Sequence, residues 1–214
     1  MDFAVYLGEE KIIVFKRGLG IVLNEPALVA RGGDKVLAVG TEALRYLDNE
    51  GVTLGAPVLN GRVHFVEDAV AMLKFASKRV GGIVECVFCV PSALSREEMD
   101  DYKTAIYSAG INEAHFVPAV LANAFDHGYD LKFADKYIST VICGDFADMV
   151  VIYKGEIIDG GVVDKIDSVE FARRKLLKKY PEMKEYLGDR INVIKGAGSM
   201  IGNPALIKKI LNIN

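Results

Sequence analysis

The feature that most constrains this fold is a strand–turn–strand unit that occurs twice, near the start of each half. A turn at Gly8 separates two apolar runs in the first copy, and a turn at Gly144 does so in the second. Each copy then passes through a lysine and a glycine, at 16–18 and 154–155, into a further apolar run. Short apolar runs joined by glycine turns are typical of antiparallel hairpins. The pattern predicts an α/β fold built on a duplicated unit.

Composition restricts the class of protein. The chain has 214 residues, of which 51% are hydrophobic, so it can form one large domain or two small ones. The net charge of −3 argues against a nucleic-acid-binding protein, which would usually carry a basic face. Its apolar runs are far shorter than the roughly 20 residues of a transmembrane helix. The first residues read as a strand, not as a signal peptide, so a cytoplasmic protein is expected.

The cysteines read as buried, reduced thiols of a cytosolic protein (Cys86, Cys89 and Cys143). Although Cys86 and Cys89 form a C-x-x-C pair, they lie in a predicted strand, where positions three apart face opposite sides. The histidines show no metal-ligand spacing and read as structural or surface residues (His64, His115 and His127). We therefore predict no metal site.

Hydrophobic periodicity and turn residues place the remaining elements. The predicted strands are 2–7, 11–16, 20–30, 36–39, 84–90, 114–117, 137–143, 149–153, 156–163 and 191–194. The predicted helices are 41–47, 67–80, one from a Ser95–Glu98 capping box to Ala109, 119–127, a basic helix at 168–180, and 204–211. Residues 49–57 read as a linker. The basic helix is expected to be solvated, with an anionic partner as the alternative.

Three stretches resemble the bacterial actin family MreB. Residues 18–30 read GLGIVLNEPALVA, similar to that family's GxGIVLNEPSVVA. Residues 36–40 resemble its VxAVG, and residues 87–92 resemble its VICVPS. The resemblance implies tandem ribonuclease-H-like modules, as in actin, Hsp70 and hexokinase, with ATP held between the halves. The modules would be residues 1–136 and a shortened second module, 137–214.

The same resemblance shows departures at the phosphate loops. Residues 6–12, YLGEEKI, stand where the family has DLGTANT, so Tyr6 replaces the metal-orienting Asp and Glu9 replaces a phosphate-binding Thr. Residues 141–148, VICGDFAD, stand where the family has DIGGGTTE. Residues 117–123 contain no acid where the family has its water-activating Glu. These differences imply that ATP binding and hydrolysis are lost.

The third nucleotide element of the superfamily is a glycine-rich turn between a strand and a helix. Residues 195–200, KGAGSM, resemble it, although such turns also arise for packing reasons. The connection at 181–190 is too short for the subdomain that the family inserts there, which puts the family's usual filament in doubt. The degenerate cleft positions, which would hold any nucleotide that does bind, are Gly8, Glu9, Glu10, Lys11, Gly144, Asp145, Asp148, Gly196, Gly198 and Ser199.

Charge supports the expected loss of nucleotide binding. Two like charges about 4 Å apart repel by roughly 4 kcal/mol at an effective dielectric near 20, and a phosphate would face such carboxylates here. The acids of the two turns would instead form a cation site if they faced one cleft, but solvated turns are the favoured interpretation (Glu9, Glu10, Asp145 and Asp148).

The sequence therefore predicts a non-catalytic actin-like protein without cofactor, a cytoskeletal scaffold or regulatory partner. Its expected partner is another copy or a true bacterial actin. One alternative is a divergent ATPase that binds ATP and Mg²⁺, with Lys11 at the phosphates and Asp145 or, preferably, Asp148 at the metal. A second alternative is a module that binds a small molecule or cation in the old cleft.

Overall fold

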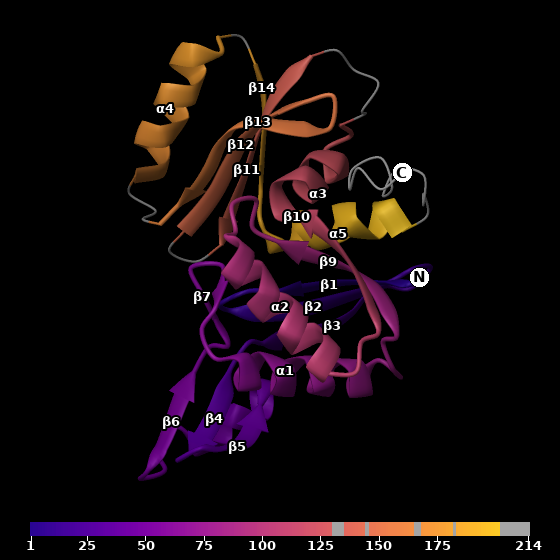
Figure 1. Cartoon of the computed structure of the whole chain (residues 1–214), viewed down its shortest axis with the longest axis vertical. Helices are drawn as coiled ribbons and strands as arrows, with labels where there is room; N and C mark the ends of the chain where they lie inside the picture. The colour runs from indigo at the N-terminus through magenta and orange to yellow at the C-terminus, as the bar shows by residue number, and fades with distance from the viewer. Residues whose placement is uncertain (130–134, 144–145, 165–167, 182, 202–214) are drawn as a thin grey trace.

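The computed structural model describes residues 1–129, 135–143, 146–164, 168–181 and 183–201. Its described strands form a five-stranded, a four-stranded, a three-stranded and a two-stranded sheet. The five- and four-stranded sheets lie one above the other with two helices between them, and a small three-stranded lobe extends below (Figure 1). This is an α/β architecture with mixed sheets, as the sequence predicted.

The first large sheet has the strand order β10-β9-β1-β2-β3. Alternation along β1 explains why it lies at the centre, because Phe3, Val5 and Leu7 pack on one side while Ala4 and Tyr6 pack on the other. Helices α1 and α2 cover the first side, and α3 and α5 cover the second. Its elements are β1 (Phe3–Leu7), β2 (Lys11–Lys16), β3 (Gly20–Pro26), α1 (Val66–Arg79), β9 (Glu85–Val90), α2 (Arg96–Ser108), β10 (Glu113–Pro118) and α3 (Ala119–Asp126).

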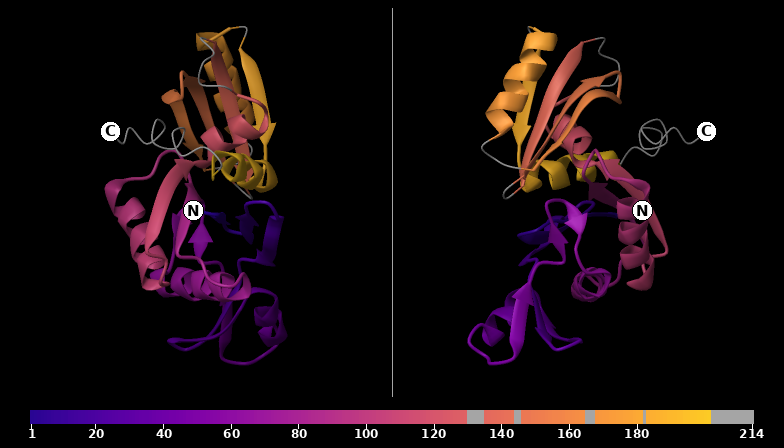
Figure 2. Two further views of the ribbon diagram at one scale, coloured as in Figure 1. Left: turned by 90° about the vertical axis from the view of Figure 1, so that its right-hand side faces the viewer. Right: turned by 60° about the vertical axis from the view of Figure 1, so that its left-hand side comes forward.

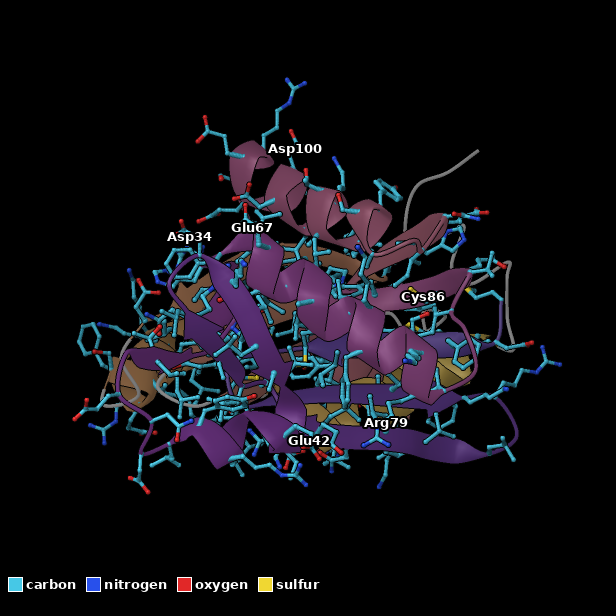
Figure 3. The ribbon with its side chains drawn as sticks, turned by 90° about the horizontal axis from the view of Figure 1, so that it is seen from below. Asp34, Glu42, Glu67, Arg79, Cys86 and Asp100 are labelled. Atoms are coloured by element: carbon cyan, nitrogen blue, oxygen red, sulfur yellow. The ribbon has the colours of Figure 1, made fainter. Side chains whose placement is uncertain are left out.

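The view from below shows the helical layer on this sheet (Figure 3). Helix α1 runs across the sheet, with Glu67 in its first turn and Arg79 in its last. Asp100 lies on the neighbouring helix α2. The predicted capping box is confirmed, since the Glu98 N–H donates to Ser95 Oγ at 3.2 Å and the Ser95 N–H donates to Glu98 Oε2 at 2.6 Å.

The small lobe differs from the prediction in three places. The single strand expected at 20–30 is divided between β3 and β4, because Pro26 ends the pairing with β2. The helix expected at 41–47 is a 3₁₀ helix, η1, and the linker at 49–57 contains strand β6. The elements of the lobe are β4 (Val29–Gly32), β5 (Lys35–Val39), η1 (Gly40–Tyr46) and β6 (Val52–Gly55), and a separate hairpin of β7 (Val58–Leu59) and β8 (Arg62–Val63) follows.

The second large sheet has the order β13-β12-β11-β14. Helix α4 packs on one face, while α3 and α5 pack on the other and so lie between the two large sheets (Figure 2). One apolar core therefore runs from the first sheet through α3 and α5 into the second. The elements are β11 (Lys136–Cys143), β12 (Phe146–Tyr153), β13 (Glu156–Val163), α4 (Val169–Lys179), β14 (Lys184–Gly188) and α5 (Arg190–Ile201).

The end of the described chain corrects one prediction. The strand expected at 191–194 is wrong, because these residues form the first turns of α5. The last strand among the described residues is β14, within the supposed connection at 181–190. The buried side chains of α5 recur at helical intervals of three and four residues, from 193 to 197 to 200 and from 194 to 197 to 201, and Gly196 and Gly198 are buried between them. The helix predicted at 204–211 lies outside the described residues. The module boundary at residue 136 stays a prediction.

Candidate functional site

The described part of the site implied by the sequence lies between the Gly8 turn and Cys143 at the end of β11, and Tyr6 lies in it. Strand β1 pairs with both β2 and β9, so the side chain of Tyr6 is held in the core between the sheets, where it is 7% exposed. Its hydroxyl donates a hydrogen bond to Cys143 Sγ at 3.0 Å. A phenol ring thus occupies the position at which the family resemblance places a metal-orienting carboxylate.

Phe146, the first residue of β12, closes the space from the other half. Its buried ring lies against Gly61, where an added Cβ would come within 3.1 Å of Phe146 Cζ. The cavity that remains between Tyr6, Gly8, Cys143 and Phe146 has a volume of about 20 Å³. That is room for one water molecule at most. The described part of the expected nucleotide cleft is therefore packed with the protein's own side chains.

The acids of the first turn are engaged in separate contacts. Glu9 Oε2 accepts a hydrogen bond from the Asn60 N–H at 3.1 Å. Glu10 forms an ion pair with Arg190, the first residue of α5. Lys11 begins β2 and lies opposite Pro26 of β3. The ion pair between Glu10 and Arg190 thus connects the first turn with the second half of the chain.

Asp148 of β12 is buried and bonded to the first half of the chain. Its carboxylate accepts two hydrogen bonds from Ser92, from the backbone N–H at 2.7 Å and from the hydroxyl at 2.5 Å. Burial raises the pKa of the Asp148 carboxyl, and the two Ser92 hydrogen bonds act in the opposite direction. This carboxylate therefore holds the two halves together.

The structure does not bring the acidic residues together as a cation site. Among the described residues, no converging group of three histidine, cysteine or carboxylate ligands contains Glu9, Glu10 or Asp148. The partners above explain this, because each of these carboxylates faces a different donor. Gly144 and Asp145 lie outside the described residues.

The glycine-rich stretch near the chain end is not a strand-to-helix turn. Gly196, Gly198 and Ser199 lie inside α5, and the Ser199 hydroxyl donates to the Gly196 carbonyl at 2.6 Å. An added Cβ on Gly196 would lie 1.8 Å from the Ala122 carbonyl oxygen of α3, so this glycine is needed for close helix packing. The predicted glycine-rich turn between a strand and a helix at 195–200 is therefore wrong.

The buried thiols of Cys143 and Cys86 keep their protons near neutral pH. Burial raises the pKa of Cys143 to about 11, and burial likewise raises the pKa of Cys86 to about 12. Cys86 packs with the α1–α2 side of the sheet, whereas Cys89 packs on the side that faces Tyr6. The prediction that the C-x-x-C pair points to opposite faces of a strand is confirmed.

Sequence reasoning missed Arg190 and Ser92, which join the halves, and Asn60, which binds Glu9 within the first half. No local pattern identifies them, because each partner lies tens of residues away or more along the chain. Residues 117–123, where the resemblance places the family's water-activating acid, form the end of β10 and the first part of α3. There Asn123 is fully buried and donates to Ser139 Oγ at 3.0 Å and to the Tyr186 carbonyl at 3.1 Å.

Comparison with known proteins places the chain in a family. The family model described as "MreB/Mbl protein" matches residues 1–175. The chain belongs to the MreB/Mbl family. The sequence resemblance and the actin-like fold that it implied are thereby confirmed. Among the described residues of this MreB/Mbl family member, no helix is long and apolar enough to cross a membrane.

Relatives of this MreB/Mbl chain are known by sequence and by structure. It is 29% identical over 179 residues to the cell shape-determining protein Mbl of Bacillus subtilis, covering 78% of this chain and 54% of that protein. It is 25% identical over 195 residues to the cell shape-determining protein MreB of Escherichia coli, covering 81% and 56%. The chain thus spans about half the length of the curated relatives it matches.

A solved structure shares the fold. The crystal structure of MreB5 of Spiroplasma citri bound to ADP matches with a TM-score of 0.67 and 20% identity, over 83% of this chain and 56% of that one. The AMPPNP-bound structure of the same protein matches with a TM-score of 0.66. The shared architecture is therefore that of the MreB fold, shortened in this chain.

Proposed function

We propose that this MreB/Mbl family member works without a nucleotide, as a cytoplasmic cytoskeletal scaffold or regulatory partner that acts through protein–protein contacts. The observation that carries the proposal is the packing of Tyr6 against Cys143, with Phe146 beside them, between the two glycine turns. The family resemblance implies that phosphates would lie beside these residues, and their packing there supports the proposal.

The size of the remaining cavity supports the proposal. Binding sites for small molecules usually have volumes of about 300–1,000 Å³, whereas the cavity between the turns measures about 20 Å³. A nucleotide would have to displace the Tyr6 ring and separate Asp148 from Ser92. Separating them would leave a buried carboxylate without its hydrogen-bond donors, which costs several kcal/mol in proteins.

Contacts between protein groups also hold the two halves of the chain together without a nucleotide between them. The Tyr6–Cys143, Glu10–Arg190 and Ser92–Asp148 pairs each connect the first half of the chain with the second. A closed arrangement held by protein groups does not depend on ligand binding. The surface then stays constant, as a scaffold requires.

Calorimetric titration with ATP and with ADP, each with and without Mg²⁺, tests the loss of nucleotide binding. We expect no saturable heat, whereas full-length MreB5 of Spiroplasma citri, solved with ADP bound, serves as the positive control. Saturable binding at micromolar affinity would overturn the proposal. If Asp148→Ala weakened that binding, the divergent ATPase would be the correct interpretation.

Sedimentation velocity tests the role in protein–protein contacts. The chain is measured alone and mixed with a full-length MreB, with and without ATP. We expect self-association or co-sedimentation that is independent of nucleotide for the chain itself. A chain that stays monomeric and binds no MreB would contradict the scaffold role.

A further inference from the structure

Three potential metal ligands meet at the end of the first sheet that lies away from the cleft. Glu85 begins β9, and Glu113 lies directly opposite it at the start of the parallel neighbour β10. His115 is two residues beyond Glu113, so strand alternation places both on one face of β10. This end carries Cys86 in Figure 3 and lies near the N-terminus in Figure 1.

The ligand atoms are close to one another. His115 Nε2 lies 3.4 Å from Glu85 Oε1 and 3.3 Å from Glu113 Oε1. All three side chains place one ligand atom each within 4.8 Å of the others. Bonds of about 2.0–2.1 Å from Zn²⁺ to nitrogen and oxygen in tetrahedral geometry separate neighbouring ligands by about 3.3 Å. The two histidine distances therefore match the edges of a zinc tetrahedron.

The two carboxylates, Glu85 and Glu113, favour a bound cation between them. Like charges directly opposite each other on neighbouring strands destabilise a sheet, and Glu85 faces Glu113 in this way. The Met1 amino group pairs with the Oε2 atom of Glu85 at 2.7 Å, which leaves Oε1 directed to His115. The imidazole of His115 lies beside both carboxylates, and a divalent cation bound among the three side chains would offset the repulsion between Glu85 and Glu113.

We propose that Glu85, Glu113 and His115 form a three-ligand site for a divalent transition metal, with Zn²⁺ as the fitting ion and a fourth position open to water. One nitrogen and two carboxylate oxygens suit zinc, whereas Mg²⁺ and Ca²⁺ favour sites made of oxygen alone. The site ties β10, an edge strand of the first sheet, to β9. This inference departs from the sequence-based expectation of no metal site and is independent of the proposed function.

Binding of Zn²⁺ by the untagged chain at about pH 7.5 tests the site, because a histidine tag would itself bind zinc. Equilibrium dialysis should give one zinc per chain. His115→Ala and Glu113→Gln should each weaken binding at least tenfold, since even changes beside a metal ligand cost 10- to 100-fold. His64→Ala is the matched control and should leave binding unchanged. An excess of Mg²⁺ should not displace the zinc.

The unfolding temperature separates a metal site from a fold defect. Zinc should raise the unfolding temperature of the unaltered chain, but not that of His115→Ala, whose circular dichroism should match the unaltered chain. Absence of saturable zinc binding, or equal binding by His115→Ala and the unaltered chain, would overturn the proposal.

Discussion

The hydroxyl of Tyr6 on β1 donates a hydrogen bond to Cys143 Sγ on β11, at 3.0 Å, across the space between the two large sheets. The two residues are 137 positions apart in the sequence. Burial raises the pKa of the Tyr6 hydroxyl, so it keeps its proton and stays a donor at every physiological pH. This contact converts an expected binding cleft into part of the core.

Removal of the Tyr6 side chain should destabilise the protein strongly. Tyr6→Ala deletes a buried ring and leaves a cavity, for which we expect a loss of about 3–5 kcal/mol in the free energy of unfolding. Tyr6→Phe keeps the ring and loses only the bond to Cys143, so about 1 kcal/mol is expected. Urea denaturation measures both values. Tyr107→Phe, at a half-exposed tyrosine of α2, is the control and should change little. Equal stability of Tyr6→Ala and the unaltered chain would show that the cleft is not packed.

Gly196→Ala should destabilise the contact between α5 and α3. Alanine favours a helix over glycine by about 1 kcal/mol, but here its Cβ would lie 1.8 Å from the Ala122 carbonyl oxygen. Because a backbone atom cannot move aside cheaply, the clash outweighs the propensity, and we expect a net loss of about 1–3 kcal/mol. Thermal unfolding measures it. Gly55→Ala, with open space around it, is the control and should be neutral. A stabilised Gly196→Ala would contradict the packing of these helices.

Asp148→Asn should change the pH dependence of stability. Burial raises the pKa of Asp148 in the folded state above its ordinary value of 3.8. Between the unfolded and folded pKa values, the folded state binds more protons, so unfolding becomes easier as pH rises through this window. The unaltered chain should therefore lose stability relative to Asp148→Asn as pH increases from about 4. Urea denaturation at a series of pH values gives the difference. A difference that is constant with pH would argue that Asp148 titrates normally.

Much of the first half was predictable from local pattern. The hairpin at Gly8, the helix at 67–80 and the Ser95 capping box all follow from residues close together in the sequence. The family was also recognisable, because residues 18–30 retain a continuous motif. Local rules succeed at such places because turn geometry, caps and one-sided periodicity are decided within a few residues.

The errors arose where local pattern is ambiguous. Residues 191–194 are a short apolar run, which fits a strand or a buried helix equally well. Their helical state is decided by packing between the two sheets, where Gly196 permits the approach of α3. Of the glycines that resembled a nucleotide turn, Gly196 is explained by this contact and Gly198 by the close approach of the Phe15 ring of β2.

By itself the sequence determined the fold family and most elements of the first half, and it predicted that the family's phosphate-loop residues are replaced. Only the tertiary structure decided what replaced them: Tyr6 against Cys143, Glu10 paired with Arg190, and Asp148 bonded to Ser92. It also brought Glu85 to Glu113 and His115. The physical reason is distance along the chain. Hairpins and caps are specified by neighbouring residues, whereas these partners meet only after distant strands and helices have packed together.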